Sequence, residues 1–358
     1  MSQRPGRLVA TLLALCLIGL TSARASEAPT SASDANTGLL SIYVFSVGSG
    51  VCIVVACPNG ARIVNDCGTI SRNGSTTAAV SYASRMLAQA PADQRYVLLS
   101  HPDLDHYNLL RNLGYEDDPG NMTVVYGGQV GGYRGFKTTD WIKAAADFQA
   151  PAPSINCASA AGDGVYILTN LVGRSANDNS AVAQYRLGST RILVMGDATG
   201  VTEAAMLSKA RKLRAPLFAD MLVASHHGAI TSGSNSQALA AAVRPGVLVF
   251  SAGGRFGHPR CASRDVYLHL RPPSLKVSQA HTFTCYYGVN RPAPPMTYDL
   301  ALYGTDDGES AIVFHTDGQR VSWASCPNNS EACLDQSLEV ARTMLRQMVA
   351  SAGIAPFP

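Results

Sequence analysis

Residues 101–106 read HPDLDH and directly follow the apolar run 96–100, YVLLS. The run is short, apolar and begins with an aromatic residue, which is typical of a buried strand, and Pro102 ends it where the polar residues begin. The loop then carries four side chains that can ligate a metal, namely His101, Asp103, Asp105 and His106. Imidazole and carboxylate suit zinc, manganese or iron, and this divided spacing can serve two ions as well as one. The alternative is a polar turn in which Asp103 caps a helix that begins at Leu104.

An apolar run followed by polar residues that can bind a ligand occurs at four further places. These are 62–65 before Asp66, 191–195 before Asp197, 221–224 before His226 and His227, and 247–250 before the loop that ends at His258. In layered α/β proteins, ligand sites collect at the rim where strands end and loops begin. Each place alone could be a turn or a surface histidine. Five of them in a chain with eight histidines favour one shared site.

The order of these motifs resembles the metallo-β-lactamase superfamily, and within it the soluble domain related to the ComEC/Rec2 competence proteins. The segments that carry the resemblance are 47–50 (VGSG), 58–60 (PNG), 65–68 (NDCG), 100–106 (SHPDLDH), 177–180 (NDNS), 196–197 (GD), 225–228 (SHHG), 251–253 (SAG), 257–259 (GHP) and 305–308 (TDDG). The resemblance implies an α/β fold, a four-layer αββα sandwich, which we expect as one domain over residues 39–325.

The resemblance also implies six metal ligands for one or two divalent ions, zinc or manganese. His101 and Asp103 would hold a first ion, and Asp197 would bridge it to a second. The ligands implied for the second ion are Asp105, His106 and His227. Two ions would lower the pKa of a bound water and neutralise charge on the attacked group.

Other residues are implied to act around these ligands. Asp66 would orient the loop from behind, while His226 and His258 would face the substrate as supporting or proton-donating groups and, with Asp105, form the catalytic set. The histidine that the family usually has before the Gly-Asp strand is missing, and Asn177 or Asn179 stands there instead. The first ion would therefore have fewer protein ligands than is usual in the family. Asp103 also replaces a histidine of the common family motif, which favours a harder ion such as Mn²⁺ over Zn²⁺.

Residues 1–25 read as a secretory signal, with two early arginines, an apolar stretch over 8–20 and a small-residue cleavage site after 23–25. Residues 26–38, rich in Ala, Ser and Thr, are expected to be a disordered leader. The signal contains three arginines and no acids, so the net charge of +3 belongs to it. A neutral mature chain lacks the broad basic field of a nonspecific nucleic-acid binder. We expect a periplasmic or secreted protein with no stable membrane association.

Eight cysteines remain after the signal, which in an exported chain predicts four disulfides. The pairing cannot be read from the sequence, although Cys261 with Cys285 and Cys326 with Cys333 would be short local closures. Cys67 is the exception to consider, because it follows Asp66 and could be a thiol beside the site.

Alternating strands and helices predict two facing sheets with helices outside. Helices are expected over 76–89, 139–148, 201–212, 235–243 and 263–270, and surface loops over 126–135 and 291–296. The tail 326–358 is expected to contain a helix over 331–350, whose apolar face docks on the core or forms a dimer contact.

Three functions are compatible with these observations. The first is a metal-dependent hydrolase of a phosphodiester, because two cations suit attack at an anionic phosphorus. Its substrate could be nucleic acid, a nucleotide or a phosphorylcholine-type ester. The second is a β-lactamase, which the carboxylate at position 103 disfavours. The third is a metal-poor protein that binds a ligand without turnover, which the missing histidine favours.

Overall fold

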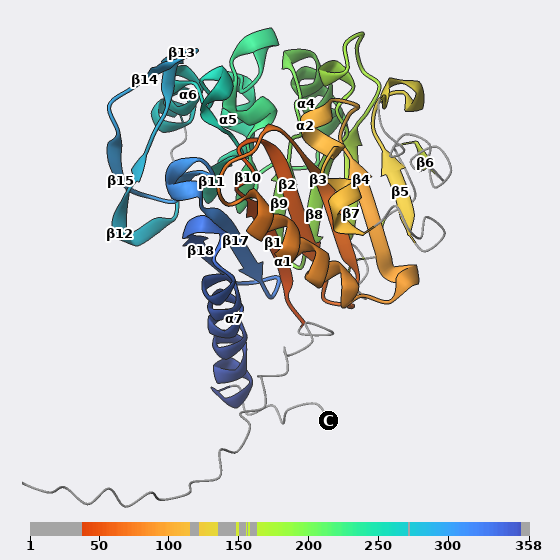
Figure 1. Cartoon of the computed structure of the whole chain (residues 1–358), viewed down its shortest axis with the longest axis vertical. Helices are drawn as coiled ribbons and strands as arrows, with labels where there is room; N and C mark the ends of the chain where they lie inside the picture. Colours follow the sequence, from red (N-terminus) through yellow and green to blue (C-terminus); the bar gives the residue numbers. More distant parts are fainter. Residues whose placement is uncertain are drawn as a thin grey trace, which may run out of the picture. The chain divides into compact units, whose positions relative to one another are not determined.

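The computed structural model describes residues 38–114, 122–134, 148–149, 155, 157, 163–270 and 273–351. Its largest sheet has eight strands (Figure 1). In spatial order they are β18 (Val321–Cys326), β17 (Ala311–Thr316), β1 (Leu40–Phe45), β2 (Ser49–Ala56), β3 (Arg62–Ser71), β4 (Arg95–Leu99), β5 (Thr123–Tyr126) and β6 (Phe148–Gln149).

A second sheet of six strands faces the first across a shared apolar core. Its order is β16 (Leu302–Gly304), β11 (Val247–Phe250), β10 (Met221–Val223), β9 (Thr190–Val194), β8 (Val182–Leu187) and β7 (Gly164–Thr169). Two short hairpins lie beside it, β12 (Lys276–Phe283) with β15 (Met296–Leu300) and β13 (Tyr286–Gly288) with β14 (Arg291–Pro292).

Helices cover the outer face of each sheet. They are α1 (Thr76–Ala88), α2 (Leu104–Tyr107), α4 (Gly200–Leu213), α5 (Gln237–Val243), α6 (Cys261–Leu270) and α7 (Glu331–Ser351). Figure 1 shows α1 lying across the strands of the first sheet. Side chains of α1 such as Tyr82 pack with Tyr43 of β1 on that outer face, whereas Ile42 of the same strand packs between the sheets with Val223 of β10. Met206 of α4 packs with Leu222 on the outer face of the second sheet.

This alternation follows from the pleat, because neighbouring residues of a strand point to opposite faces and both faces of each sheet are covered. The result is a four-layer αββα sandwich with a C-terminal helix, as the sequence predicted. Burial of apolar side chains in three separate layers supplies most of the free energy that opposes the entropy of the unfolded chain.

The parallel strands of the two sheets bring the site residues to one rim. β3 pairs in parallel with β4, and β9, β10 and β11 are parallel to one another. The carboxyl ends of parallel strands meet at the same edge of a sheet. The loops that follow β4, β9, β10 and β11 therefore emerge together.

The strand that contains Asp66 does not end there, which corrects one expectation. β3 continues to Ser71 and keeps pairing with β2, although the register shifts between Val64 and Cys67. Asp66 has a φ of 58°. This left-handed residue acts as a bulge, which turns the Asp66 side chain to the rim while the strand proceeds.

The predicted helices over 76–89, 201–212, 235–243 and 263–270 match α1, α4, α5 and α6 within two residues. Most of the helix expected over 139–148 lies outside the described residues, and Phe148 belongs to β6. The loop expected over 291–296 contains the short strand β14 and the first residue of β15, because the chain pairs with β13 and β12 there. The loop expected over 126–135 contains a single helical turn at Val130–Gly132 in its described part.

Four disulfides confirm the predicted cysteine chemistry. The pairs are Cys52–Cys67, Cys57–Cys157, Cys261–Cys285 and Cys326–Cys333. The idea of a free thiol at Cys67 is wrong, since the register of β2 and β3 places Cys67 directly opposite Cys52.

The C-terminal helix docks on the body of the fold by its apolar side. Leu334 packs into the layer between the first sheet and its helices, and Leu338 and Ala341 pack with Leu39. None of the helices in the described ranges is long and apolar enough to cross a membrane. The signal expected over 1–25 and residues 26–37 of the expected leader lie outside those ranges.

Candidate metal centre

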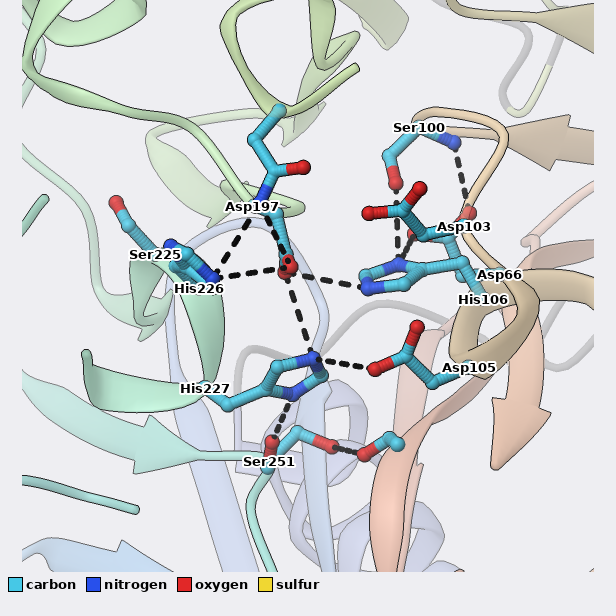
Figure 2. A network of polar contacts seen from close by, with 12 residues as sticks. Asp66, Ser100, Asp103, Asp105, His106, Asp197, Ser225, His226, His227 and Ser251 are labelled. Carbon is cyan, nitrogen blue, oxygen red and sulfur yellow. Dashed lines mark hydrogen bonds and ion pairs between the residues drawn. The ribbon is translucent and has the colours of Figure 1, made fainter. Parts of the chain in front are cut away.

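The loop after β4 presents its polar side chains through one turn of helix. The helix α2 starts directly after Asp103, which occupies the N-cap position with extended backbone but makes no capping hydrogen bond through its side chain. The carboxylate of Asp103 is thus left unused by the helix, contrary to the alternative of a simple polar cap. Asp105 and His106 lie within α2 and point to the rim (Figure 2).

Asp197, in the loop after β9, stands among histidines from two other loops, those that follow β4 and β10. Its Oδ1 lies 3.2 Å from His106 Nε2 and 3.5 Å from His227 Nε2. Its Oδ2 lies 3.8 Å from His101 Nε2 and 3.7 Å from His226 Nε2. Figure 2 shows the Asp197 carboxylate between His226, His227 and His106. One buried carboxylate therefore faces four imidazole nitrogens.

Two overlapping groups of residues have ligand atoms close enough to share an ion. One is His101, His106 and Asp197, and the other is Asp105, His106 and His227; within each group the ligand atoms lie within 4.8 Å of one another. His227 Nε2 is 3.6 Å from Asp105 Oδ2. His106 belongs to both groups, so the two candidate ion positions adjoin one another.

The converging atoms are buried and lack hydrogen bonds. Among the described residues, these atoms are Nε2 of His101, His106 and His227 and Oδ1 of Asp197. Ligands of one tetrahedral ion at about 2.1 Å are about 3.4 Å apart. Asp197 Oδ1 lies 3.2 Å from His106 Nε2 and 3.5 Å from His227 Nε2, and these separations match that spacing better than the usual length of a hydrogen bond. Since buried polar atoms without partners are costly, the residues present fit a bound divalent cation.

The opposite nitrogen of each imidazole is held by the fold. His106 Nδ1 lies 3.0 Å from Asp66 Oδ2, and Asp66 Oδ1 accepts a 2.7 Å hydrogen bond from the backbone nitrogen of Ser100. His227 Nδ1 is 2.6 Å from the carbonyl oxygen of Ser251. A proton kept on Nδ1 of each ring would leave Nε2 as the lone pair for a metal, once a bound cation displaces the proton from Nε2.

The carboxylates of the site are held in their ionised form. Burial opposes ionisation of Asp197, but the imidazoles of His227 and His106 outweigh it and lower its pKa well below the usual value. Burial also opposes ionisation of Asp105, yet the neighbouring imidazoles of His227 and His106 lower its pKa to about 2. For His106, burial disfavours the charged form, but Asp197 and Asp66 raise its pKa well above the usual value. Ionised carboxylates are the form that ligates a cation.

The remaining predicted residues lie at different distances from this centre. The side chain of Asp103 is 45% exposed, and its Oδ2 lies 3.3 Å from His101 Nε2, so it stands at the open side and joins neither of the two groups. Asn177 Nδ2 lies 3.5 Å from Asp197 Oδ2 and 3.3 Å from His226 Nε2. Asn179 is not at the site. Its Oδ1 accepts from the backbone nitrogen of Gly173, because the turn at Asn177–Asn179 points the two asparagines in different directions.

The expected substrate-facing residues line an open cleft of about 670 Å³ above the centre. His226 and His258 are both in its wall, with ring centroids 6.1 Å apart. Gly257 before His258 has a φ of 65°, and a side chain there would collide with the carbonyl of Gly288. The histidine loop is therefore pressed against the β13–β14 hairpin.

The imidazole of His258 is unprotonated at neutral pH. Burial and the neighbouring imidazoles of His227 and His226 lower its pKa to about 3. Burial also lowers the pKa of His226. Both rings are therefore neutral near pH 7, which suits hydrogen bonding or proton acceptance better than the donation expected from the sequence.

Several residues of the site were not predicted from the sequence. The hydroxyl of Ser100 lies 2.9 Å from His101 Nδ1 and 3.2 Å from His106 Nδ1, and its place directly before the motif could have indicated this. Arg134 and Arg260 contribute the positive charge of the cleft wall. Arg134 comes from a loop far from any motif, so only the tertiary structure brings it there.

No family model matches the chain, and no curated protein matches it. Solved structures with a similar backbone include the diiron β-hydroxylase CmlA from Streptomyces venezuelae, with a TM-score of 0.41 and 14% identity over 64% of this chain and 50% of that one. The short form of human tRNase Z matches with a TM-score of 0.36 and 14% identity over 58% of this chain and 90% of that one. A metal-dependent hydrolase of the β-lactamase superfamily matches with a TM-score of 0.39 and 14% identity over 64% of this chain and 93% of that one.

The match spans about half the length of CmlA. The finer resemblance to the ComEC/Rec2 proteins stays a prediction.

Proposed function

We propose that the protein is an exported metal-dependent hydrolase that cleaves phosphodiesters. The observation that carries the proposal is the convergence of buried ligand atoms from His101, His106, Asp197 and His227, at ion-like spacing and without hydrogen bonds. A structural centre would be closed on all sides, whereas this one opens into a cleft.

The two overlapping groups provide for one or two ions. His101 and Asp197, with Asp103 at the open side, would hold the first, and Asp105, His106 and His227 would hold the second. When bound, divalent ions would supply Lewis-acid chemistry at the attacked group and activation of water. The mixture of imidazole and carboxylate ligands suits zinc or manganese.

The walls of the cleft favour an anionic ester. Arg134 and Arg260 provide positive charge, and Phe256 and Val289 provide an apolar surface beside them. Guanidinium groups pair well with phosphate oxygens. The substrate class is therefore a phosphoester that carries an apolar or planar group, which includes nucleotides and nucleic acid. The neutral rings of His258 and His226 would hydrogen-bond to it.

The disulfides support export. Four pairs persist only in an oxidising compartment, and residues 1–25 have the character of a secretory signal. These two observations support the proposal that the protein acts in the periplasm or outside the cell.

Metal analysis of the purified protein together with hydrolysis of bis(p-nitrophenyl) phosphate tests the proposal. We expect one or two equivalents of zinc or manganese per chain and turnover that stops in the Asp105→Ala variant. The matched control is Asp93→Ala, on a short turn before β4 and away from the cleft, which should keep full activity. A protein that holds metal but hydrolyses a chromogenic cephalosporin and no phosphodiester would identify a β-lactamase instead.

A non-catalytic binding protein is the second candidate. Asn177 stands beside Asp197 where the family usually has a histidine, and Asp103 is half exposed, so the first ion has few protein ligands. Absence of metal after dialysis against zinc and manganese, together with retained affinity for a phosphodiester, would support this candidate and overturn the hydrolase.

A further inference from the structure

The loop that carries His226 and His227 has an unfavourable backbone. His226 has φ 50° and ψ 48°, His227 has φ 54° and ψ 21°, and Gly228 follows with φ 80°. Residues with a Cβ rarely adopt this left-handed region. Two consecutive histidines persist in it only when the surroundings hold them there.

A buried carboxylate lies behind this loop. Glu203, on α4, is 1% exposed. Its Oε1 accepts hydrogen bonds from Ser225 Oγ at 3.0 Å and from the backbone nitrogen of Asn235 at 2.7 Å. Its Oε2 accepts one from the backbone nitrogen of Ser236 at 3.0 Å. Glu203 thus joins the residue before the histidine pair to the start of α5.

The second half of the same network encloses the histidine pair. Asn235 Nδ2 donates to the carbonyl oxygens of Ser225 at 2.9 Å and Ala229 at 2.7 Å. These two carbonyls stand on either side of residues 226–228. Asn235 Oδ1 in turn accepts from the hydroxyl of Tyr267 on α6 at 3.2 Å. Three helices therefore hold the loop at both ends.

We propose that Glu203 is a positioning residue for the candidate metal centre, which through Ser225 and Asn235 keeps the Nε2 atoms of His226 and His227 aimed at Asp197. The inference rests on the proposed function for its metal readout. Figure 2 shows Ser225 adjoining His226 on the side away from His106, where this support acts. Glu203 is outside the family motifs and touches none of the candidate ligands.

The hydrogen-bond pattern makes Glu203→Gln a specific test, because this substitution disturbs the network with little change in shape. Glutamine has nearly the same shape but only one accepting oxygen. If the amide nitrogen of the glutamine takes the place of Oε2, this nitrogen faces the backbone N–H of Ser236. If it takes the place of Oε1, it faces the backbone N–H of Asn235. Either orientation sets a donor against a donor, so the variant cannot restore the network by flipping.

Met206→Ala is the matched control. Met206 lies one turn along α4, is 2% exposed and packs in the core beneath the second sheet. Its truncation lowers stability without touching the network. Ser225→Ala removes one of the three donors and serves as a mild variant should Glu203→Gln fold poorly.

The experiment has two readouts. In metal-free protein, hydrogen exchange of peptides covering 225–229 should be faster in Glu203→Gln and in Ser225→Ala than in Met206→Ala. Titration with Zn²⁺ should show an affinity about 10- to 100-fold weaker in Glu203→Gln, the usual effect of losing a group behind a metal ligand. The Met206→Ala variant should bind zinc within twofold of the wild type.

The two hypotheses fail in different ways. If the wild type binds no metal but the 225–229 peptides still lose protection in Glu203→Gln, the metal-dependent function is wrong and the positioning role stands. If Glu203→Gln keeps both its loop protection and its zinc affinity at the level of Met206→Ala, the positioning role is wrong and the proposed function is unaffected.

Discussion

At the scale of single residues, the candidate centre depends on side chains held from behind. Asp66 turns out of β3 through a left-handed backbone and reaches both Ser100 and His106. The carbonyl oxygen of Ser251, directly after β11, holds Nδ1 of His227 in the same way. His106 and His227 are thus each fixed by a hydrogen bond on the nitrogen that does not face Asp197, so their geometry exists before any ion binds.

His258 gives a prediction at this scale. We expect His258→Ala to lower phosphodiester turnover by about 10²- to 10⁴-fold, the usual scale for proton transfer or hydrogen bonding by a placed side chain. Bound metal should stay constant, because His258 belongs to neither ligand group. Turnover and metal content of the same preparation check this. Loss of metal would make His258 a ligand, and unchanged turnover would leave it only a loop residue.

At the scale of elements, two features tie distant parts of the chain together. The disulfide Cys57–Cys157 joins the end of β2 to a residue 100 positions later, near Ile155, which bridges to Val165 of β7. It therefore connects the first sheet to the second. On the other side, α7 rests on β17 and β18, and His315 of β17 lies 3.2 Å from the hydroxyl of Ser337 on that helix.

The long disulfide should contribute more to stability than a short one. In the chain-entropy model a bridge closing about 100 residues stabilises by up to about 4.7 kcal/mol, while measured values are typically 2 to 5 kcal/mol. We expect the double variant Cys57→Ala, Cys157→Ala to lose an amount in that range in urea unfolding. The pair Cys326 and Cys333, only 7 residues apart, should lose less when replaced in the same way. The reverse order would contradict the role assigned to the long bridge.

His315 predicts acid sensitivity of the sheet beneath α7. Burial, with a contribution from Arg342, lowers its pKa to about 3. The unfolded chain takes up a proton on His315 near pH 6.5, whereas the folded chain does not. The contribution of His315 to the free energy of unfolding is therefore constant above pH 6.5 and falls as the pH drops from 6.5 towards 3. The slope from one group is at most about 1.4 kcal/mol per pH unit.

Urea unfolding of the wild type and of His315→Gln at pH 7, 6, 5 and 4 measures this slope. Glutamine can keep hydrogen bonds to Ser41 and Ser337 but does not titrate. Other groups titrate alike in both proteins, so the difference isolates His315. Parallel curves would show that the pKa of His315 is not lowered in the folded state.

At the scale of the whole molecule, the fold is expected to be independent of the metal. Two covered sheets and four disulfides hold the described body together. We therefore expect a strong chelator to abolish hydrolysis while far-UV circular dichroism and a cooperative thermal transition remain. The transition should shift down by only the binding free energy of the ion. Unfolding on chelation would identify the ion as structural.

The sequence by itself determined the layered class, most helices and the rim on which the site lies. Apolar runs that are followed by HPDLDH, GD, SHHG and GHP predict where strands end. The carboxyl ends of parallel strands share one edge of a sheet, so this local pattern was enough to predict where the site lies. Only the tertiary structure decided the rest. It paired Cys57 with Cys157 and turned Asn179 away. It also placed Glu203 behind the histidines. These facts depend on contacts between segments far apart in the chain, for which a single sequence contains no spacing rule.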